Sequence, residues 1–133
     1  MKSLPTIAIL AAVMLAPVVG LAGAPLEPVD PAPDPHFNRL YHPDEIDAML
    51  QGYADAYPDW VKLESIGKSL GGRDIWLLTI NNPDTGEDTA KPGMYIDGAI
   101  HANEAQATET TLYIIDYVLK NYGKLDRITE LMD

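Results

Sequence analysis

The chain has 133 residues, a length that suits one domain or part of one. Asp and Glu outnumber Lys and Arg by 20 to 9, giving a formal net charge of -11 at pH 7, so nucleic acid and anionic membrane surfaces are excluded as favourable partners. The absence of cysteine excludes disulfides, a thiolate nucleophile and cysteine ligands to a metal.

Residues 1–24 have the layout of a secretory signal peptide. They carry one charge, at Lys2, followed by an apolar run over residues 7–21 and three small residues at 22–24. We therefore expect an exported protein, secreted or periplasmic, with no membrane association after signal cleavage. The alternative is a membrane-anchored protein with an uncleaved N-terminal segment, because residues 4–24 approach the roughly 20 apolar residues that span a bilayer.

Residues 25–40 form a segment rich in proline and aspartate. Five prolines fall between Ala24 and His36, a composition that favours an extended chain. We expect this segment to be a spacer that does not pack against the rest of the protein. The domain itself is then predicted to occupy residues 41–133.

The first half of the predicted domain consists of a helix followed by a hairpin. Proline and acidic residues at positions 43–45 are typical of a helix start, and apolar residues recur at helical spacing from Ile46 to Tyr53. Alternating residues over 60–66 and an apolar run over 74–81 predict two strands. Gly71-Gly72 lies between them and indicates a β-hairpin.

The second half is predicted to contain a polar loop, a strand and a long helix. The loop covers residues 81–92, and the mostly apolar run over 93–100 predicts a strand buried on both faces. A helix is expected from Glu104 to Tyr122, ended by Gly123. A shorter helical segment follows over residues 125–132.

His101 and Glu104 follow the predicted strand and stand three positions apart. Imidazole nitrogen and carboxylate oxygen are ordinary zinc donors, and a catalytic zinc uses three protein ligands with a fourth position open to water. A helical wheel places Glu104 on the apolar side of the helix, where a carboxylate needs a metal or a donor, and Asp116 on the polar side. The alternative is ordinary helix capping, in which Asn103 pairs with Gln106 and the Glu104 carboxylate interacts with the positive end of the helix dipole.

The residues around this pair resemble the zinc metallocarboxypeptidases of the carboxypeptidase A type, peptidase family M14. Their first metal motif is His-x-x-Glu between a strand and a helix, similar to residues 100–104 here. A second match lies upstream, where residues 66–75 are similar to the hairpin signature of the family. The resemblance covers residues 41–133. It implies an α/β fold, the N-terminal part of a mixed-sheet zinc carboxypeptidase domain of the phosphorylase/hydrolase-like type.

This resemblance implies that His101 and Glu104 bind one Zn²⁺ and that the substrates are the C-termini of peptides or proteins. Asn103 stands where some members have an arginine that polarises the substrate carbonyl, so it is the predicted substrate-binding residue. In the family, the third ligand and the glutamate general base come far downstream, beyond Asp133 here. We therefore expect a truncated and inactive chain with no catalytic residue of its own.

Two other classes of function remain open. A noncatalytic exported binding module would use the same scaffold without a metal. A related zinc hydrolase acting on cell-wall peptides or acylated amino acids would keep the zinc pair and change the residues that hold the substrate. His36 and His42 are the other histidines, but one lies beside the spacer and the other at a helix start, so neither is expected to be the third ligand.

Overall fold

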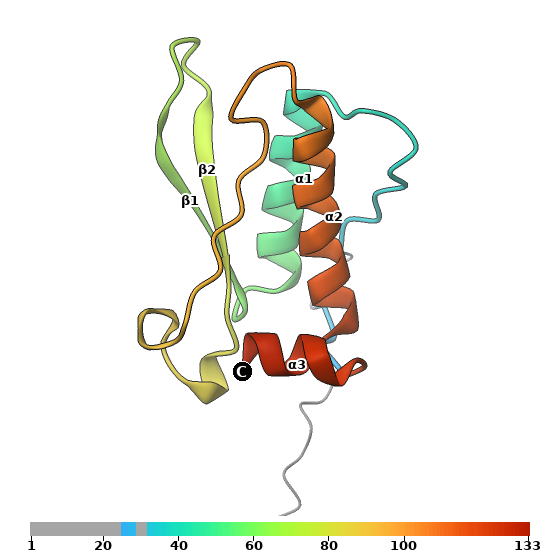
Figure 1. The fold of residues 1–133 in the computed structure, drawn as a ribbon, viewed down its shortest axis with the longest axis vertical. Helices are drawn as coiled ribbons and strands as arrows, with labels where there is room; N and C mark the ends of the chain where they lie inside the picture. Colours follow the sequence, from blue (N-terminus) through green and yellow to red (C-terminus); the bar gives the residue numbers. More distant parts are fainter. Residues whose placement is uncertain (1–24, 29–31) are drawn as a thin grey trace, which may run out of the picture.

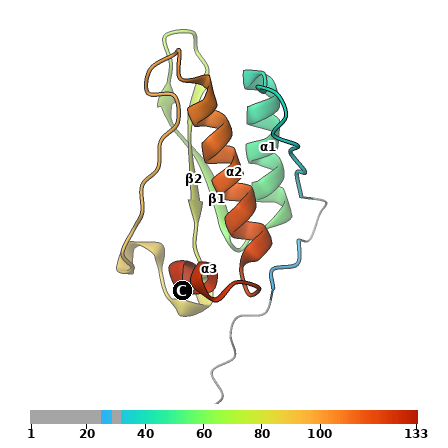
Figure 2. The same cartoon turned by 45° about the vertical axis from the view of Figure 1, so that its right-hand side comes forward.

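The computed structural model describes residues 25–28 and 32–133, so the predicted signal peptide lies outside the described residues. Within them the chain forms the helices α1, α2 and α3 and one antiparallel pair of strands, β1 and β2 (Figure 1). The two longer helices lie side by side, and the hairpin lies along one side of them (Figure 2). In the described part of the chain, no helix has both the length and the apolarity needed to cross a bilayer.

Helix α1 (Pro43–Ala56) begins with a capping box. The Nδ1 atom of His42 accepts a hydrogen bond from the Asp44 N–H over 3.4 Å, and a Glu45 carboxylate oxygen accepts one from the His42 N–H over 2.7 Å. The apolar stripe of the helix buries Leu50 and Tyr53. The predicted helix is confirmed.

Strands β1 (Val61–Lys68) and β2 (Asp74–Ile80) form the predicted hairpin, with Val61 opposite Ile80. A bulge interrupts the pairing between Ser65 and Gly67. The connecting turn contains Gly72 at φ +80°, a left-handed conformation that glycine adopts without steric cost. The following polar loop contains two short 3₁₀ turns, η1 (Pro83–Thr85) and η2 (Asp88–Ala90).

Helices α2 (Ala105–Asn121) and α3 (Asp126–Met132) also agree with the prediction. Gly123, at φ +68°, separates them. One core joins α1, α2 and the start of β1 and consists of Leu50, Tyr53, Ala56, Tyr57, Val61, Leu112, Ile115 and Leu119.

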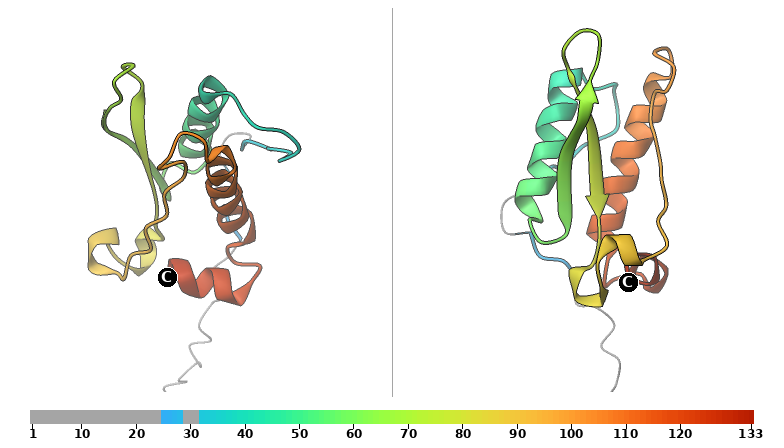
Figure 3. Two further views of the ribbon diagram at one scale, coloured as in Figure 1. Left: turned by 45° about the horizontal axis from the view of Figure 1, so that its top comes forward. Right: turned by 90° about the vertical axis from the view of Figure 1, so that its left-hand side faces the viewer.

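Residues 93–100 do not form the predicted strand, and this prediction is wrong. They connect η2 to α2 as an irregular segment, seen in both views of Figure 3. Met94 and Ile100 are 84% and 75% exposed, so the apolar run is not buried either. A strand needs a neighbour to pair with its backbone, and the sheet in the described residues pairs β1 with β2 alone. An apolar pattern shows that residues suit burial, but it does not supply the neighbouring strand.

The proline-rich segment does pack against the helices, contrary to expectation. Leu26, Ala32 and Phe37, which lie in its described parts, are partly buried against the core. The Phe37 ring meets Tyr113 of α2 edge to face, with ring centroids 5.4 Å apart. Prolines restrict the unfolded chain, so a proline-rich segment loses less entropy when it packs against a helix.

Asp116 is buried rather than on a solvated face, which corrects the helical-wheel prediction. It is 8% exposed, and its Oδ1 accepts hydrogen bonds from the Tyr53 hydroxyl over 2.9 Å and lies 3.0 Å from Lys120 Nζ. Burial, together with the Asp116 carboxylate, raises the pKa of Tyr53. The wheel failed because α1 covers this flank of α2, and a polar residue tolerates burial where partners meet it.

Candidate metal centre

His101 and Glu104 lie in the turn that leads into α2. The Glu104 N–H donates to the His101 carbonyl oxygen over 3.0 Å, and the Glu104 carbonyl oxygen accepts from the Ala107 N–H over 2.9 Å. The Glu104 carboxylate reaches back, with Oε2 3.3 Å from the His101 backbone nitrogen and Oε1 2.9 Å from Nδ1 of the His101 ring. One carboxylate therefore orients both the backbone and the ring of His101.

These two donor atoms fit two positions of a tetrahedral zinc site. Zinc bonds of about 2.0 to 2.2 Å separate adjacent nitrogen and oxygen ligands by about 3.3 Å. The observed separation of 2.9 Å is that of a hydrogen bond, so an entering ion has to widen it by about 0.4 Å. The side chains are 73% and 46% exposed, which leaves room for this movement and for access from solvent.

No third metal ligand joins the pair in the part of the chain that the structure describes, where no group of three or more suitable side chains is found. His42 caps α1, as expected. The backbone N–H of His36 donates to the Tyr41 hydroxyl over 2.9 Å. The described residues thus bring together the two predicted ligands and leave the other two histidines elsewhere.

Glu104 is not aimed into the core, and this corrects the argument from the helical wheel. Its backbone lies at φ -92° and ψ 49°, so helical geometry begins at Ala105 and a wheel that includes Glu104 is invalid. The alternative of side-chain capping by Asn103 is not seen either, since no side chain caps the start of α2. Asn103 is exposed beside the two ligands, and its role in substrate binding remains a prediction.

Gly98 and Ala99 were not singled out from the sequence, yet they shape the approach to this turn. Ala99 lies at φ +60°, a left-handed conformation that costs a residue other than glycine about 1 kcal/mol or more. A methyl group on Gly98 would lie 2.8 Å from Thr111 Oγ1 and 2.9 Å from the Ala107 carbonyl oxygen. The Asp97-Gly98 dipeptide is a turn signal that could have revealed this feature, but the apolar residues around it favoured a strand.

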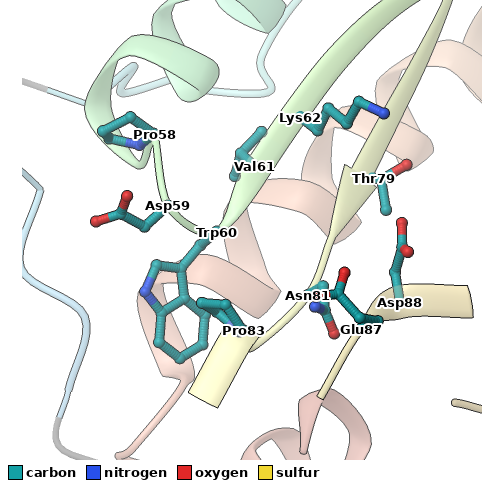
Figure 4. Close-up of a pocket in the computed structure, with 10 residues that line it drawn as sticks. All are labelled: Pro58, Asp59, Trp60, Val61, Lys62, Thr79, Asn81, Pro83, Glu87 and Asp88. Carbon is teal, nitrogen blue, oxygen red and sulfur yellow. The ribbon is translucent and has the colours of Figure 1, made fainter. Parts of the chain in front are cut away.

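A surface hollow of about 270 Å³ lies away from this pair, between the start of β1 and the loop after β2 (Figure 4). Trp60, which directly precedes β1, and Lys62 of β1 contribute to it, as do Glu87 and Asp88 from the loop. Neither His101 nor Glu104 lines the hollow. The chemistry of the pair is therefore that of an exposed turn rather than of a closed pocket.

Comparison with known proteins identifies the family. Residues 46–133 match the Peptidase_M14 family, described as zinc carboxypeptidase. This chain belongs to the zinc carboxypeptidase family. The matched range includes both the hairpin signature and the His101–Glu104 turn.

Several curated carboxypeptidases resemble this zinc carboxypeptidase chain. Carboxypeptidase B of Astacus astacus is 39% identical over 89 residues, covering 66% of this chain and 28% of that protein. Carboxypeptidase M of Mus musculus is 32% identical over 95 residues, covering 71% of this chain and 21% of that protein. Carboxypeptidase D of Drosophila melanogaster is 34% identical over 96 residues, covering 66% of this chain and 6% of that protein.

The chain therefore spans from 6% to 28% of the length of these three relatives. They carry the names carboxypeptidase B, M and D, so the similarity establishes the zinc carboxypeptidase family and not specifically its A type.

Proposed function

We propose that this chain supplies the first two zinc ligands, and the N-terminal part of the catalytic domain, of a carboxypeptidase that removes C-terminal residues from peptides. The observation that carries this proposal is the 2.9 Å approach of His101 Nδ1 to Glu104 Oε1 within the residues that match the family. A noncatalytic module would have no need for this convergence of donors.

His101 and Glu104 have distinct tasks in the proposed site. His101 would hold the ion through Nδ1, the ring nitrogen that faces Glu104, and Glu104 would hold it through Oε1. The second carboxylate oxygen, Oε2, continues to accept the His101 N–H and keeps the turn closed. A bound zinc ion lowers the pKa of its water and polarises a scissile carbonyl.

The remaining parts of the reaction are proposed to come from residues that follow Asp133. They comprise the third ligand and a general base that accepts the proton of the attacking water. Asn103 is exposed between the two ligands, where its amide can donate a hydrogen bond to a substrate carbonyl. The closer assignment to the carboxypeptidase A type is supported by the residues that resemble that group, at 66–75 and 100–104.

The proposed location is secreted or periplasmic. It is supported by the apolar run and small residues of segment 1–24, which have the order of a cleavable signal peptide. The alternative of an uncleaved membrane anchor would be recognised by an intact N-terminus on the mature protein. N-terminal sequencing of the protein from its exported fraction distinguishes the two.

A C-terminal release assay tests the proposed activity. Synthetic peptides are incubated with the 133-residue chain and with a version extended to the full catalytic domain, and released amino acids are measured by mass spectrometry. We expect release by the extended protein alone. A zinc chelator and His101→Ala should both abolish it, whereas His42→Ala, the matched histidine control, should not. Release that survives both the chelator and His101→Ala would refute the proposal.

A further inference from the structure

We infer that Gly98 and Ala99 are positioning residues of the metal centre. Together they hold the segment before His101 against α2 and thereby fix His101 relative to Glu104. The inference rests on the proposed function, because it concerns the same two ligands. It adds to that function the backbone features that set the separation of the donor atoms.

The first observation is the close approach of Gly98 to α2. The nearest atoms to a methyl group on Gly98 would be Thr111 Oγ1 at 2.8 Å and the Ala107 carbonyl oxygen at 2.9 Å. These two atoms are themselves joined by a hydrogen bond of 2.9 Å, donated by the Thr111 hydroxyl. The Ala107 oxygen belongs to the helix backbone and cannot rotate away, so a larger residue has to move the incoming segment off the helix.

The second observation is the left-handed backbone at Ala99, directly after this contact. Ala99 adopts φ +60°, a conformation outside the extended and helical regions, just before the turn from His101 to Glu104 that leads into α2. Two residues, Ala99 and Ile100, separate Gly98 from His101. His101 is then held on its other side by Glu104, whose carboxylate meets both its N–H and its ring.

His101 is therefore placed between two attachments to the same helix. One is the contact of Gly98 with the Ala107–Thr111 turn, and the other is the Glu104 carboxylate at the helix start. Only Ala99 and Ile100 lie between Gly98 and His101, and each residue spans at most about 3.6 Å of chain. The two positions can therefore move little relative to each other. A displacement of Gly98 is thus passed on to His101. Metal sites tolerate errors of only about 0.5 Å in ligand position.

Gly98→Ala tests the inference, with Gly93→Ala as the matched control. A methyl group on Gly93 meets no atom within 4 Å, although the residue lies in the same segment. Three quantities are measured on the 133-residue chain: Zn²⁺ affinity by titration calorimetry, the ¹⁵N signal of the His101 ring without metal, and the unfolding midpoint without metal. We expect Gly98→Ala to weaken Zn²⁺ binding about 10- to 100-fold relative to Gly93→Ala. It should also shift the His101 Nδ1 signal, with an unfolding midpoint equal to that of Gly93→Ala.

Equal affinity and an equal His101 signal in the two variants would overturn the inference. So would a loss of affinity that is matched by an equal loss of stability, because this would indicate a purely structural role. If the parent chain binds no Zn²⁺, the proposed metal site fails, and the zinc-free His101 signal still decides whether Gly98 positions the ring.

Substitutions at Ala99 provide a second test that does not depend on the folding of Gly98→Ala. Glycine adopts φ +60° freely, whereas a β-branched residue is strongly disfavoured there. We expect Ala99→Gly to keep the parent affinity for Zn²⁺ and the parent His101 signal. Ala99→Val should change both. Identical behaviour of these two variants would overturn the role assigned to Ala99.

Discussion

The packed helices and the turn that carries His101 and Glu104 are built in opposite ways. Tyr53, Leu112 and Leu119 are at most 2% exposed in the core between α1 and α2. Most side chains of residues 93–104, by contrast, are exposed, and the segment is held by a few specific contacts. The stabilising core and the proposed metal site thus lie in different parts of this molecule. Substitutions in one part are expected to spare the other.

The largest expected effect on stability comes from Leu112→Ala. Leu112 is 2% exposed, and removing its side chain leaves a cavity in the core that α1 and α2 share. We expect a loss of about 3 kcal/mol in the free energy of unfolding, measured by urea denaturation. Leu131→Ala is the control, because Leu131 is 70% exposed, and it should change stability by less than about 0.5 kcal/mol. Similar losses in both variants would contradict the assigned core.

At alkaline pH, stability should depend on the buried tyrosines. Burial, and then the Asp133 carboxylate, raises the pKa of Tyr122 to about 12. The folded state therefore retains this proton while the unfolded state loses it at about pH 10. This contribution to the free energy of unfolding is on the order of 2 kcal/mol. It is present in full below pH 10 and is lost as the pH rises toward 12.

Urea denaturation between pH 9 and pH 12 measures this loss. Tyr122→Phe removes the titrating group, so its stability should fall less steeply over that range. A parent chain and a Tyr122→Phe variant with the same pH profile would show that the ionisation of Tyr122 is not coupled to folding.

A smaller effect is expected from Phe37→Ala in the proline-rich segment. Its ring meets Tyr113 with centroids 5.4 Å apart, and such aromatic pairs contribute about 1 kcal/mol. The variant should lose about that much stability and exchange the amide hydrogens of residues 32–41 faster. Asn38→Ala, at an exposed neighbouring position, serves as the control. Unchanged exchange in Phe37→Ala would show that this segment is a free spacer after all.

The elements of the packed region could be predicted because their signals are local. The capping residues before α1, the glycines of the hairpin and Gly123 after α2 act within a few residues of their own positions. Contacts between distant segments were less accessible. The burial of Asp116 depends on Tyr53, which lies 63 positions away, and no periodicity within α2 reveals that partner.

The candidate metal centre could be proposed from its residue types, whereas its backbone geometry could not be predicted, and metal binding by His101 and Glu104 stays a prediction. Chemistry and spacing single out His101 and Glu104 as candidate ligands, and the structure brings their donor atoms together. The prediction for the backbone before them, a strand over the apolar residues 93–100, is wrong. The left-handed Ala99 and the contact of Gly98 with α2 depend on the packing of one segment on another. Sequence patterns describe single segments and so miss such contacts.

A Zn²⁺ titration of His101→Ala, combined with urea unfolding of the same variant, tests most directly whether chemistry and stability are separate here. His101 has a side chain 73% exposed and makes its ring contact with Glu104. We predict that the parent chain binds one Zn²⁺ and that His101→Ala binds none. The unfolding free energies of the two should agree within about 0.5 kcal/mol. Zinc binding by His101→Ala at the parent affinity, or a loss of stability as large as that of Leu112→Ala, would contradict this account.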